Sequence, residues 1–318
     1  MSVKFGIIGP GNIARKMADA INKSDCASLY AVASRNLEKA KTFCEAYQCD
    51  LAYGDYDEML ADPNIDAVYI ALPNGLHMEM ALKAMKQHKA VLCEKPFAPS
   101  YGSAKPVVDY AEKHDILFVE GMWTRWLPAI SKVKEWISSE KIGKVRLIAA
   151  SFGFYSEGDL SNHRFNPQLH GGALMDVGCY CVDTILYLVG EKPKTTSGIL
   201  DYGDTGVDVT GVMSMSFPSG VLAHGDFSIK TPTDDDLWIY GEKGKILLKH
   251  FWRCREAVCF NQSGEVTDTF ADSEENGFIY ELKEFCDLYQ KGNNQSAYMS
   301  WADTLLCAEN FDKIRCSN

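Results

Sequence analysis

The sequence predicts an α/β protein whose N-terminal half is a doubly wound parallel sheet and whose C-terminal half contains a mostly antiparallel sheet. In residues 1–125, short apolar runs alternate with stretches of helical periodicity, which is typical of parallel strands with helices on both faces. In residues 195–270, short strand-like segments are separated by turn residues, which indicates antiparallel pairing. A chain of 318 residues is long enough for two domains, which we expect at residues 1–125 and 126–318.

The expected elements of the N-terminal half alternate regularly. Strands are expected at residues 3–9, 28–34, 67–72, 90–94 and 116–121, and helices at 12–22, 37–47, 76–87 and 101–114. The strands lack strict alternation of polar and apolar residues, as expected when both faces of a sheet are buried. The later elements are a helix at 127–138, a strand at 145–152 and helices at 174–189, 279–289 and 300–314.

Composition argues against several classes of protein. Hydrophobic residues make up 46% and charged residues 24% of the chain, values near the average for globular proteins. The formal net charge of −11 argues against a nucleic-acid partner, because phosphate binding uses a clustered basic surface. The N-terminus does not resemble a secretion signal, and no apolar run is long enough for a membrane span. We therefore expect a cytoplasmic protein without a membrane partner.

The eleven cysteines are scattered, mostly in apolar or helical segments. None has the spacing of a metal finger, and the closest pair, Cys179 and Cys181, is too tight for the usual C-x-x-C ligand pair. We expect the cysteines to be reduced thiols that pack as small apolar residues, and we expect no metal site.

A glycine-rich turn follows the first expected strand and opens the first expected helix. It reads Gly9-Pro-Gly11-Asn12-Ile13-Ala14, which has the spacing G-x-G-x-x-A. Such a turn lets backbone N–H groups and the helix N-terminus contact a pyrophosphate, and a small third residue allows close helix–sheet packing. An ordinary glycine turn is the alternative. The placement between a strand and a helix favours dinucleotide binding by Gly9, Gly11, Asn12 and Ile13.

The end of the second expected strand indicates which nicotinamide dinucleotide binds. NAD-binding domains usually carry Asp or Glu there for the ribose 2′-hydroxyl, whereas this chain has Ser34 and Arg35. A carboxylate would repel a 2′-phosphate, but Ser34 can donate a hydrogen bond to it and Arg35 can pair with it. We therefore expect NADP as the cofactor, with NAD as the alternative. The alternative is that Arg35 only stands at the start of a helix and is exposed to solvent.

Leu72, Asn74 and His77 follow the strand 67–72, at the edge where a parallel sheet faces its cofactor. We predict that all three contact the dinucleotide. Two alternatives stay open: Asn74 is the N-cap of the following helix, and His77 is a packed structural histidine.

Glu94, Lys95 and Pro96 stand at the end of the strand 90–94. A lysine at this carboxyl end lies beside the expected nicotinamide, where it can polarise a substrate oxygen or lower the pKa of a hydroxyl group. Pro96 fixes the backbone just after it. We predict that Glu94 and Lys95 contact the cofactor and that Lys95 is catalytic.

Asp176 and Tyr180 lie in the first turns of the expected helix 174–189. They are four residues apart and so share one helix face, where a carboxylate and a phenol can hold a substrate hydroxyl between them. The alternative is a carboxylate at a helix N-terminus and a tyrosine in the core. Spacing by itself favours that alternative.

Together these motifs resemble the glucose–fructose oxidoreductase, inositol dehydrogenase and rhizopine-catabolism (Gfo/Idh/MocA) family. The resemblance covers essentially the whole chain and rests on the glycine turn, residues 73–77 (PNGLH), residues 94–96 (EKP) and residues 171–183 (GGALMDVGCYCVD). It implies a Rossmann domain followed by an α/β domain with a large open sheet. That sheet often forms the dimer interface, so the resemblance implies a homodimer.

The resemblance also implies roles for residues at matching positions. Lys95 matches the catalytic lysine, and Asp176 matches the acidic residue that holds the substrate. Tyr180 stands where many members carry an acid/base histidine. With the stretch 122–126 (MWTRW), this tyrosine is similar to the branch of dihydrodiol dehydrogenases and NADP-linked xylose dehydrogenases. Arg125 in that stretch matches positions near the cofactor.

Trp123, Phe154 and Arg164 are the remaining candidate substrate contacts. Packing is the alternative role for Trp123. The implied reaction is hydride transfer between NADP and a carbinol carbon, or its carbonyl, in a sugar, polyol or cyclic diol.

In that reaction Tyr180 exchanges the hydroxyl proton while Lys95 stabilises its phenolate, because a free phenol with a pKa near 10 is a poor base at neutral pH. Asp176 orients the substrate. Two rival classes remain: an NAD-linked inositol-type dehydrogenase, and a non-catalytic NADP-binding regulator of the same fold.

Overall fold

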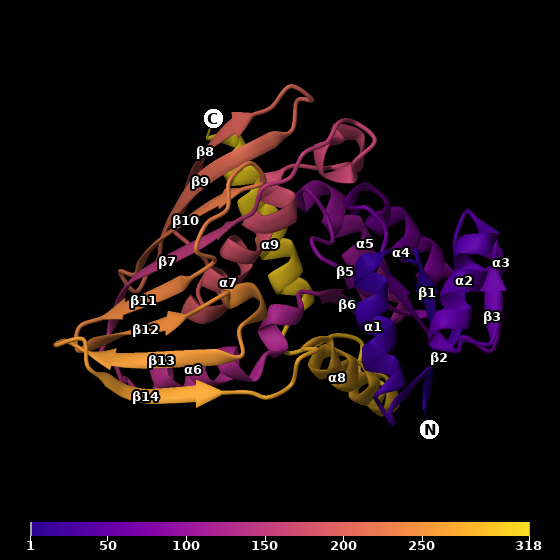
Figure 1. The fold of residues 1–318 in the computed structure, drawn as a ribbon, viewed down its shortest axis with the longest axis horizontal. Helices are drawn as coiled ribbons and strands as arrows, with labels where there is room; N and C mark the ends of the chain where they lie inside the picture. The colour runs from indigo at the N-terminus through magenta and orange to yellow at the C-terminus, as the bar shows by residue number, and fades with distance from the viewer. Residues whose placement is uncertain (1, 318) are drawn as a thin grey trace. The chain divides into compact units, whose positions relative to one another are not determined.

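The computed structural model describes residues 2–317, which form two compact units (Figure 1). One unit contains residues 2–123 and 276–305, and the other contains residues 124–275 and 306–317. The first change of unit therefore lies two residues before the boundary that we expect after residue 125. The return of residues 276–305 to the first unit is not expected from the sequence, because a helical pattern does not show which sheet the helix covers.

The first unit contains a six-stranded sheet with the strand order β3-β2-β1-β4-β5-β6. Every neighbouring pair is parallel. The strand order reverses between β1 and β4, as in doubly wound sheets that bind a dinucleotide at that point, and this confirms the predicted fold class. The strands are β1 (Val3–Ile8), β2 (Ala27–Ala33), β3 (Leu51–Tyr53), β4 (Ala67–Ile70), β5 (Ala90–Glu94) and β6 (Phe118–Gly121).

Helices follow most of these strands, and side chains satisfy free backbone N–H groups where three of them begin. Asn36 accepts from the N–H of Lys39 at 3.2 Å, Asp55 from that of Asp57 at 2.7 Å, and Ser100 from that of Ser103 at 3.3 Å. Helix α8 packs beside α1 (Figure 1). The helices of this unit are α1 (Asn12–Asn22), α2 (Leu37–Tyr47), α3 (Tyr56–Leu60), α4 (His77–Lys86), α5 (Tyr101–His114) and α8 (Phe278–Lys291).

Strand β3 and helix α3 are not predicted from the sequence. Both are short, with three and five residues, and the residues of β3 are all at least partly exposed. Such segments contain no apolar run and no full helical period, so the periodicity that predicts the other elements is absent.

The second unit contains an eight-stranded sheet with the order β14-β13-β12-β11-β7-β10-β9-β8. Strands β7 and β10 pair in parallel and the other neighbours are antiparallel, which confirms the predicted mostly antiparallel sheet. The strands are β7 (Val145–Gly153), β8 (Thr195–Tyr202), β9 (Asp208–Ser216), β10 (Leu222–Ser228), β11 (Leu237–Gly241), β12 (Gly244–Leu248), β13 (Glu256–Asn261) and β14 (Val266–Ala271).

Helices pack against one face of this sheet (Figure 1). Helix α6 (Pro128–Ser138) lies against β13 and β14, and α7 (Cys179–Val189) lies against β7 and β10. Residues alternate between buried and exposed along β9. The side chains that point away from the helices include the exposed apolar groups of Ile199, Val212 and Leu222. The last helix, α9 (Trp301–Cys316), begins in the first unit and ends in the second.

Residues 167–189 form the only described segment that is long and apolar enough to cross a membrane, and 83% of its apolar window is buried inside the protein. Its last part is α7, and residues 174–178 form a π-helical turn that leads into it. The high burial is that of a core helix, because its apolar residues are covered on all sides.

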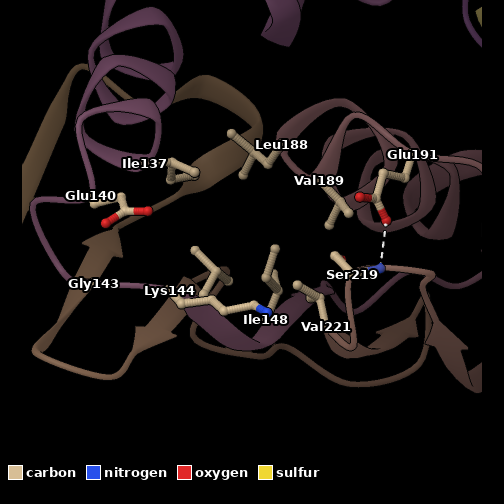
Figure 2. A pocket seen from close by; sticks show the side chains of 11 residues that line it. Ile137, Glu140, Gly143, Lys144, Ile148, Leu188, Val189, Glu191, Ser219 and Val221 are labelled. Atoms are coloured by element: carbon tan, nitrogen blue, oxygen red, sulfur yellow. Dashed lines mark hydrogen bonds between the residues drawn. The ribbon is translucent and has the colours of Figure 1, made fainter.

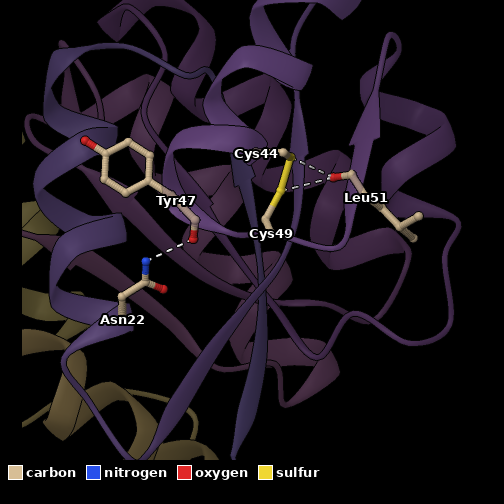
Figure 3. Close-up of a disulfide and its surroundings, with 5 residues drawn as sticks. All are labelled: Asn22, Cys44, Tyr47, Cys49 and Leu51. Carbon is tan, nitrogen blue, oxygen red and sulfur yellow. Dashed lines mark hydrogen bonds between the residues drawn. A yellow bond between two sulfur atoms is a disulfide. The ribbon is translucent and has the colours of Figure 1, made fainter.

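Cys44 and Cys49 form a disulfide (Figure 3), so the prediction of reduced cysteines is wrong for this pair. Helix α2 ends at Tyr47, and the left-handed conformation of Gln48 turns the chain back until the two Cα atoms are 4.6 Å apart. Both sulfur atoms lie near the Leu51 carbonyl oxygen. A return of the chain over its own helix end is a tertiary feature that spacing alone does not reveal. The other nine cysteines are free thiols.

Candidate active site

Gly9 and Gly11 leave the N-terminus of α1 open. Gly9 has a φ of +92°, and a Cβ there would lie 2.9 Å from the Ala71 carbonyl oxygen, so only glycine fits. A Cβ on Gly11 would meet no atom within 4 Å, so this N-cap position has free space around it. No side chain of the described residues caps α1. The N–H groups of its first turn, from Asn12 and Ile13 onward, are therefore available to a phosphate.

Ser34 and Arg35 follow β2 directly. The buried Ser34 hydroxyl oxygen accepts from the N–H of Asn36 at 3.2 Å, which leaves its hydrogen for a second acceptor. Asn36 is the N-cap of α2, so Arg35 precedes the helix. Arg35 is exposed and forms no ion pair within residues 2–317. An exposed guanidinium beside an available hydroxyl fits a 2′-phosphate.

Asn74 does not cap a helix. Residues 74–76 form a short 3-10 helix before α4, and the two N-cap positions fall on Pro73 and Leu76. The alternative in which Asn74 is the N-cap of the following helix is therefore wrong. Contact of Leu72 and Asn74 with the cofactor remains a prediction; both are partly exposed, as such contact requires.

His77 is fully buried and joins two backbone segments. Its Nδ1 lies 3.0 Å from the carbonyl oxygen of Pro96, and its Nε2 lies 2.7 Å from the carbonyl oxygen of Leu72. Burial lowers the pKa of His77 to about 4, so the ring is neutral at neutral pH and donates to one of the two carbonyls. These contacts favour the structural alternative, in which His77 positions the loop after β4 against the segment after β5.

Buried side chains also hold the backbone around Lys95, which is itself partly exposed. Glu94 Oε2 accepts from the N–H of Lys95 at 3.3 Å, and Glu120 Oε1 accepts from the N–H of Phe97 at 2.8 Å. His77 holds the carbonyl between these two N–H groups. Lys95 thus extends from a rigid backbone at the carboxyl end of β5, the edge at which the sequence predicts it to act.

The carboxyl group of Glu94 accepts hydrogen bonds from other residues of the first unit. Glu94 is buried, and besides the N–H of Lys95 its carboxyl accepts a hydrogen bond from the hydroxyl of Tyr69. Burial raises the pKa of Glu94 to about 6, although the Tyr69 hydroxyl and the Lys95 charge oppose the shift. These partners favour a role in positioning Lys95.

Trp123 and Phe278 form a stacked pair in the first unit. Their ring centroids are 4.8 Å apart with an interplanar angle of 25°, and both residues are buried. The stack joins the segment after β6 to the first residue of α8. This contact supports the packing alternative for Trp123, and Phe278 is a neighbour that the sequence analysis does not identify.

Arg125 forms a buried ion pair in the second unit. Its Nε lies 2.9 Å and 3.1 Å from the two carboxylate oxygens of Asp183, and its Nη2 lies 2.7 Å from one of them. The two side chains are 1% and 0% exposed, and the guanidinium also lies over the ring of Tyr187. This bidentate pairing favours a structural role in which Arg125 holds α7 through Asp183. The pairing gives no support to the predicted contact of Arg125 with the cofactor.

Asp176, Arg164 and Phe154 come together in the second unit. Arg164 Nε donates to Asp176 Oδ2 at 2.6 Å, and the guanidinium carbon lies 5.3 Å from the centre of the Phe154 ring. The side chains of Arg164 and Asp176 are 35% and 22% exposed, so both are accessible to a ligand. Three predicted substrate contacts therefore form one group.

Two glycines make that group possible. A Cβ on Gly171 would clash with the backbone of Arg164, and Gly172 has a φ of +117°, which favours glycine. The N–H of Gly172 donates to the Arg164 carbonyl at 2.8 Å, so the loop before the glycines folds back onto the start of the helix. Asp208, a residue that the sequence analysis misses, accepts from the N–H of Leu174 at 2.6 Å and fixes the first π turn.

Tyr180 lies in an aromatic cluster of the second unit. The ring of Phe152 is 5.5 Å and that of Trp252 is 6.1 Å from the Tyr180 ring, centre to centre. Phe152 and Trp252 are stacked at 4.9 Å with an interplanar angle of 7°. Tyr180 is buried, whereas Trp252 is partly exposed. Trp252 is not predicted from the sequence, because no motif links position 252 to position 180.

A pocket of the second unit lies elsewhere (Figure 2). The last residues of α7, Leu188 and Val189, help to line it. They lie roughly 12 Å from Tyr180 along the helix axis, at a rise of 1.5 Å per residue. None of the predicted site residues lines it. Its lining residues are Ile137, Glu140, Gly143, Lys144, Val145, Ile148, Leu188, Val189, Glu191, Ser219 and Val221.

Comparison with known proteins identifies the family. Residues 3–122 match the oxidoreductase family with an NAD-binding Rossmann fold, Gfo/Idh/MocA, and residues 130–247 match the C-terminal domain of the same family. The chain belongs to the Gfo/Idh/MocA oxidoreductase family. The predicted family is therefore confirmed, and with it the predicted class, a nicotinamide-dependent oxidoreductase.

Individual relatives are similar over almost their whole length. A trans-1,2-dihydrobenzene-1,2-diol dehydrogenase of Xenopus laevis is 30% identical over 98% of this chain and 97% of its own length. The scyllo-inositol 2-dehydrogenase (NADP⁺) of Bacillus subtilis is 30% identical over 98% of this chain and 96% of its own length. A crystal structure of a 3-ketoreductase from Actinomadura kijaniata has a TM-score of 0.91 at 23% identity, covering 100% and 98% of the two chains, which shows the same fold.

Proposed function

We propose that the protein transfers a hydride between NADP and a CH–OH group, or the matching carbonyl, of a sugar, polyol or cyclic diol. The observation that carries the cofactor choice is Arg35, an exposed cation next to the Ser34 hydroxyl where NAD-specific domains carry a carboxylate. Two relatives support the substrate class, because one is named as a dehydrogenase of a cyclic diol and the other as a dehydrogenase of an inositol.

The proposed chemistry assigns one task to each of three residues. When bound, NADP would supply the hydride-accepting chemistry of its nicotinamide ring, or the hydride-donating chemistry in the reverse direction. Tyr180 takes the hydroxyl proton during oxidation and returns a proton to the oxygen during reduction. Lys95 supplies the positive charge that stabilises the phenolate form of Tyr180. Asp176 accepts a hydrogen bond from a substrate hydroxyl and orients it.

The surroundings of Asp176 and Tyr180 support a cyclic substrate. Arg164 donates to Asp176 through Nε, so a donor and an acceptor are present together for neighbouring hydroxyl groups. Phe152 stacks on the ring of Trp252, and the guanidinium of Arg253 lies 4.8 Å from its centre, so the polar pair, rather than this ring, supports a cyclic substrate. Vicinal hydroxyls on a six-membered ring match a neighbouring donor and acceptor.

The test is a screen of cyclic diols, inositols and aldoses with NADP and with NAD, followed through the absorbance of the reduced nicotinamide. We expect turnover with NADP and a cyclic diol or sugar. Preference for NAD would support the inositol-type alternative. Tight NADP binding without turnover of any of these substrates, in either direction, would support the regulator alternative.

We further infer that the protein is a cytoplasmic homodimer. The sheet of the second unit exposes the apolar side chains of Ile199, Val212 and Leu222 on the face away from its helices. A symmetric partner would cover such a face. Nine of the eleven cysteines are free thiols, which supports a reducing compartment, while the Cys44–Cys49 disulfide counts against it. Light scattering at micromolar concentration tests the dimer, and a monomer would contradict it.

A further inference from the structure

Glu281 on α8 is a buried acid with no partner in the described part of the chain. The residue is 1% exposed, and neither carboxyl oxygen has a hydrogen-bond partner among residues 2–317. The other two buried glutamates of the first unit differ from it, because Glu94 and Glu120 each accept a backbone N–H. A buried carboxylate without a donor is costly, so Glu281 needs a specific explanation.

Glu281 lies beside Glu94. On the parallel strands β5 and β6, Glu94 pairs with Gly121. Paired residues of neighbouring strands direct their side chains to the same face of a sheet. A Cβ on Gly121 would lie 3.5 Å from Glu281 Oε2, an ordinary van der Waals contact, so the Glu281 carboxyl lies next to Gly121 on that face of the sheet. The strand pairing therefore places the two carboxyl groups on the same face as neighbours.

Tyr69 belongs to the same group. Tyr69 pairs with Leu92, two residues before Glu94, so its ring points to the same face of the sheet as the Glu94 carboxyl. Its hydroxyl donates to Glu94 Oε1, and both acids interact electrostatically with it. The three side chains come from β4, β5 and α8. Glu94 links this group to Lys95, because its carboxyl accepts from the N–H of Lys95.

The two carboxyl groups share one negative charge. Two neighbouring carboxylates cannot both ionise cheaply away from water. Glu94 has the hydroxyl of Tyr69 and the N–H of Lys95 to stabilise its charge, whereas Glu281 has no donor, so the proton remains on Glu281. Burial and the Glu94 charge both raise the pKa of Glu281 well above its usual value, which agrees with this assignment. The titratable groups around the pair are Tyr69, Cys93, Lys95, Glu120 and Glu284.

We propose that Glu281 is a positioning residue that remains a neutral carboxylic acid at neutral pH, so that Glu94 is the only charged member of the Glu94–Glu281 pair. A neutral acid is a hydrogen-bond donor, so protonation would let Glu281 donate to the neighbouring Glu94 carboxylate, whereas an ionised Glu281 has no donor to bind among the described residues. Glu94 in turn holds the N–H of Lys95, so Glu281 acts on the reaction through the position of Lys95. This inference rests on the proposed catalytic role of Lys95.

Infrared spectroscopy tests the protonation state without measuring activity. A protonated carboxylic acid has a C=O stretching band that a carboxylate lacks. At neutral pH the wild type should show a band that disappears in Glu281→Gln. The matched control is Glu284→Gln on the same helix, because an amide there still accepts from Ser296; this variant should keep the band. Its absence from the wild type, or its persistence in Glu281→Gln, would overturn the proposal.

Kinetics test the positioning role. Glu281→Met removes the donor at similar volume, and kcat should fall about tenfold or more, the usual effect of losing a hydrogen bond to a charged group. The KM for NADP should stay nearly unchanged, because Glu281 has no exposed surface for the cofactor. Glu281→Gln, which is neutral and keeps a donor, should restore most of the lost kcat.

Two kinetic outcomes would contradict the proposal. Equal losses in the Gln and Met variants would mean that Glu281 acts through a negative charge, and an unchanged kcat in Glu281→Met would mean that it does not position Lys95. The proposed function fails separately, when Lys95→Met keeps full turnover while the infrared band of Glu281 is still present.

Discussion

The surroundings of Lys95 and those of Asp176 are built differently. The backbone of Lys95 is held by buried ionisable side chains, His77, Glu94 and Glu120. The segment of Asp176 is held by glycine conformations and backbone bonds, and its pair with Arg164 is accessible to solvent. We therefore expect a change near Lys95 to act through stability and protonation, and a change near Asp176 to act through substrate binding.

The largest expected effect would show that both regions serve one reaction. Lys95→Met and Tyr180→Phe should each lower kcat by roughly 10²–10⁴, the usual contribution of general acid–base catalysis. The double variant should be little worse than either single one, because groups that act together are not additive. Steady-state kinetics on the best substrate measures this. A near-normal kcat in Tyr180→Phe would remove Tyr180 from the proton transfer and leave Lys95 or a bound water as the donor.

Two arginine–aspartate pairs of the second unit give the next comparison. Arg125→Ala removes the cation that pairs with the fully buried Asp183 carboxylate and should cost about 3–5 kcal/mol of unfolding free energy. Arg164→Ala breaks a partly exposed pair and should cost at most about 1 kcal/mol, while raising the KM for the substrate. Urea denaturation and kinetics of both variants check this. Equal losses of stability would show that burial does not distinguish the pairs.

The third prediction concerns pH and the buried histidine near Lys95. The pKa of His77 is about 4 in the folded protein, below the ordinary histidine value of 6.5, so the unfolded chain binds a proton more readily. Stability that is present above pH 6.5 should therefore be lost as the pH falls toward 4, by roughly 3 kcal/mol at 1.36 kcal/mol per pH unit. Denaturation at several pH values should show this loss in the wild type and a smaller one in His77→Gln.

The exposed His114 of α5 supplies the matched control for that measurement. His114→Gln should retain the pH dependence of the wild type. If His77→Gln and the wild type lose the same stability between pH 6.5 and 4, another group is responsible for the acid sensitivity of the first unit.

The smallest expected effect concerns Arg35, which is exposed although it belongs to the same unit as Lys95. Arg35→Asp should weaken NADP binding by about one to two decades, because a charge-assisted contact worth about 1.5–3 kcal/mol becomes a repulsion. Unfolding free energy should change little. Calorimetric titration with NADP and NAD measures this, and equal affinity of the wild type for both cofactors would contradict the assignment of Arg35.

Much of the site could be predicted from residues that are close in the sequence. The glycine turn at Gly9 and the Asp176–Tyr180 spacing each lie within one strand–turn–helix segment, so local patterns identify them. Arg125 shows the limit of such patterns. Its position in a recognisable stretch indicates a site near the cofactor, but its partner Asp183 is 58 residues away and buries the guanidinium.

The sequence by itself determined the two sheets, the helices longer than two turns, the dinucleotide turn and the family, because these depend on periodicity and on short motifs. Tertiary structure alone decided which distant side chains meet. It returned α8 to the first unit, placed Glu281 beside Glu94 and brought Trp252 to Tyr180. The physical reason is that burial and partners set the charge and the role of a side chain, and both depend on contacts between residues far apart in the chain.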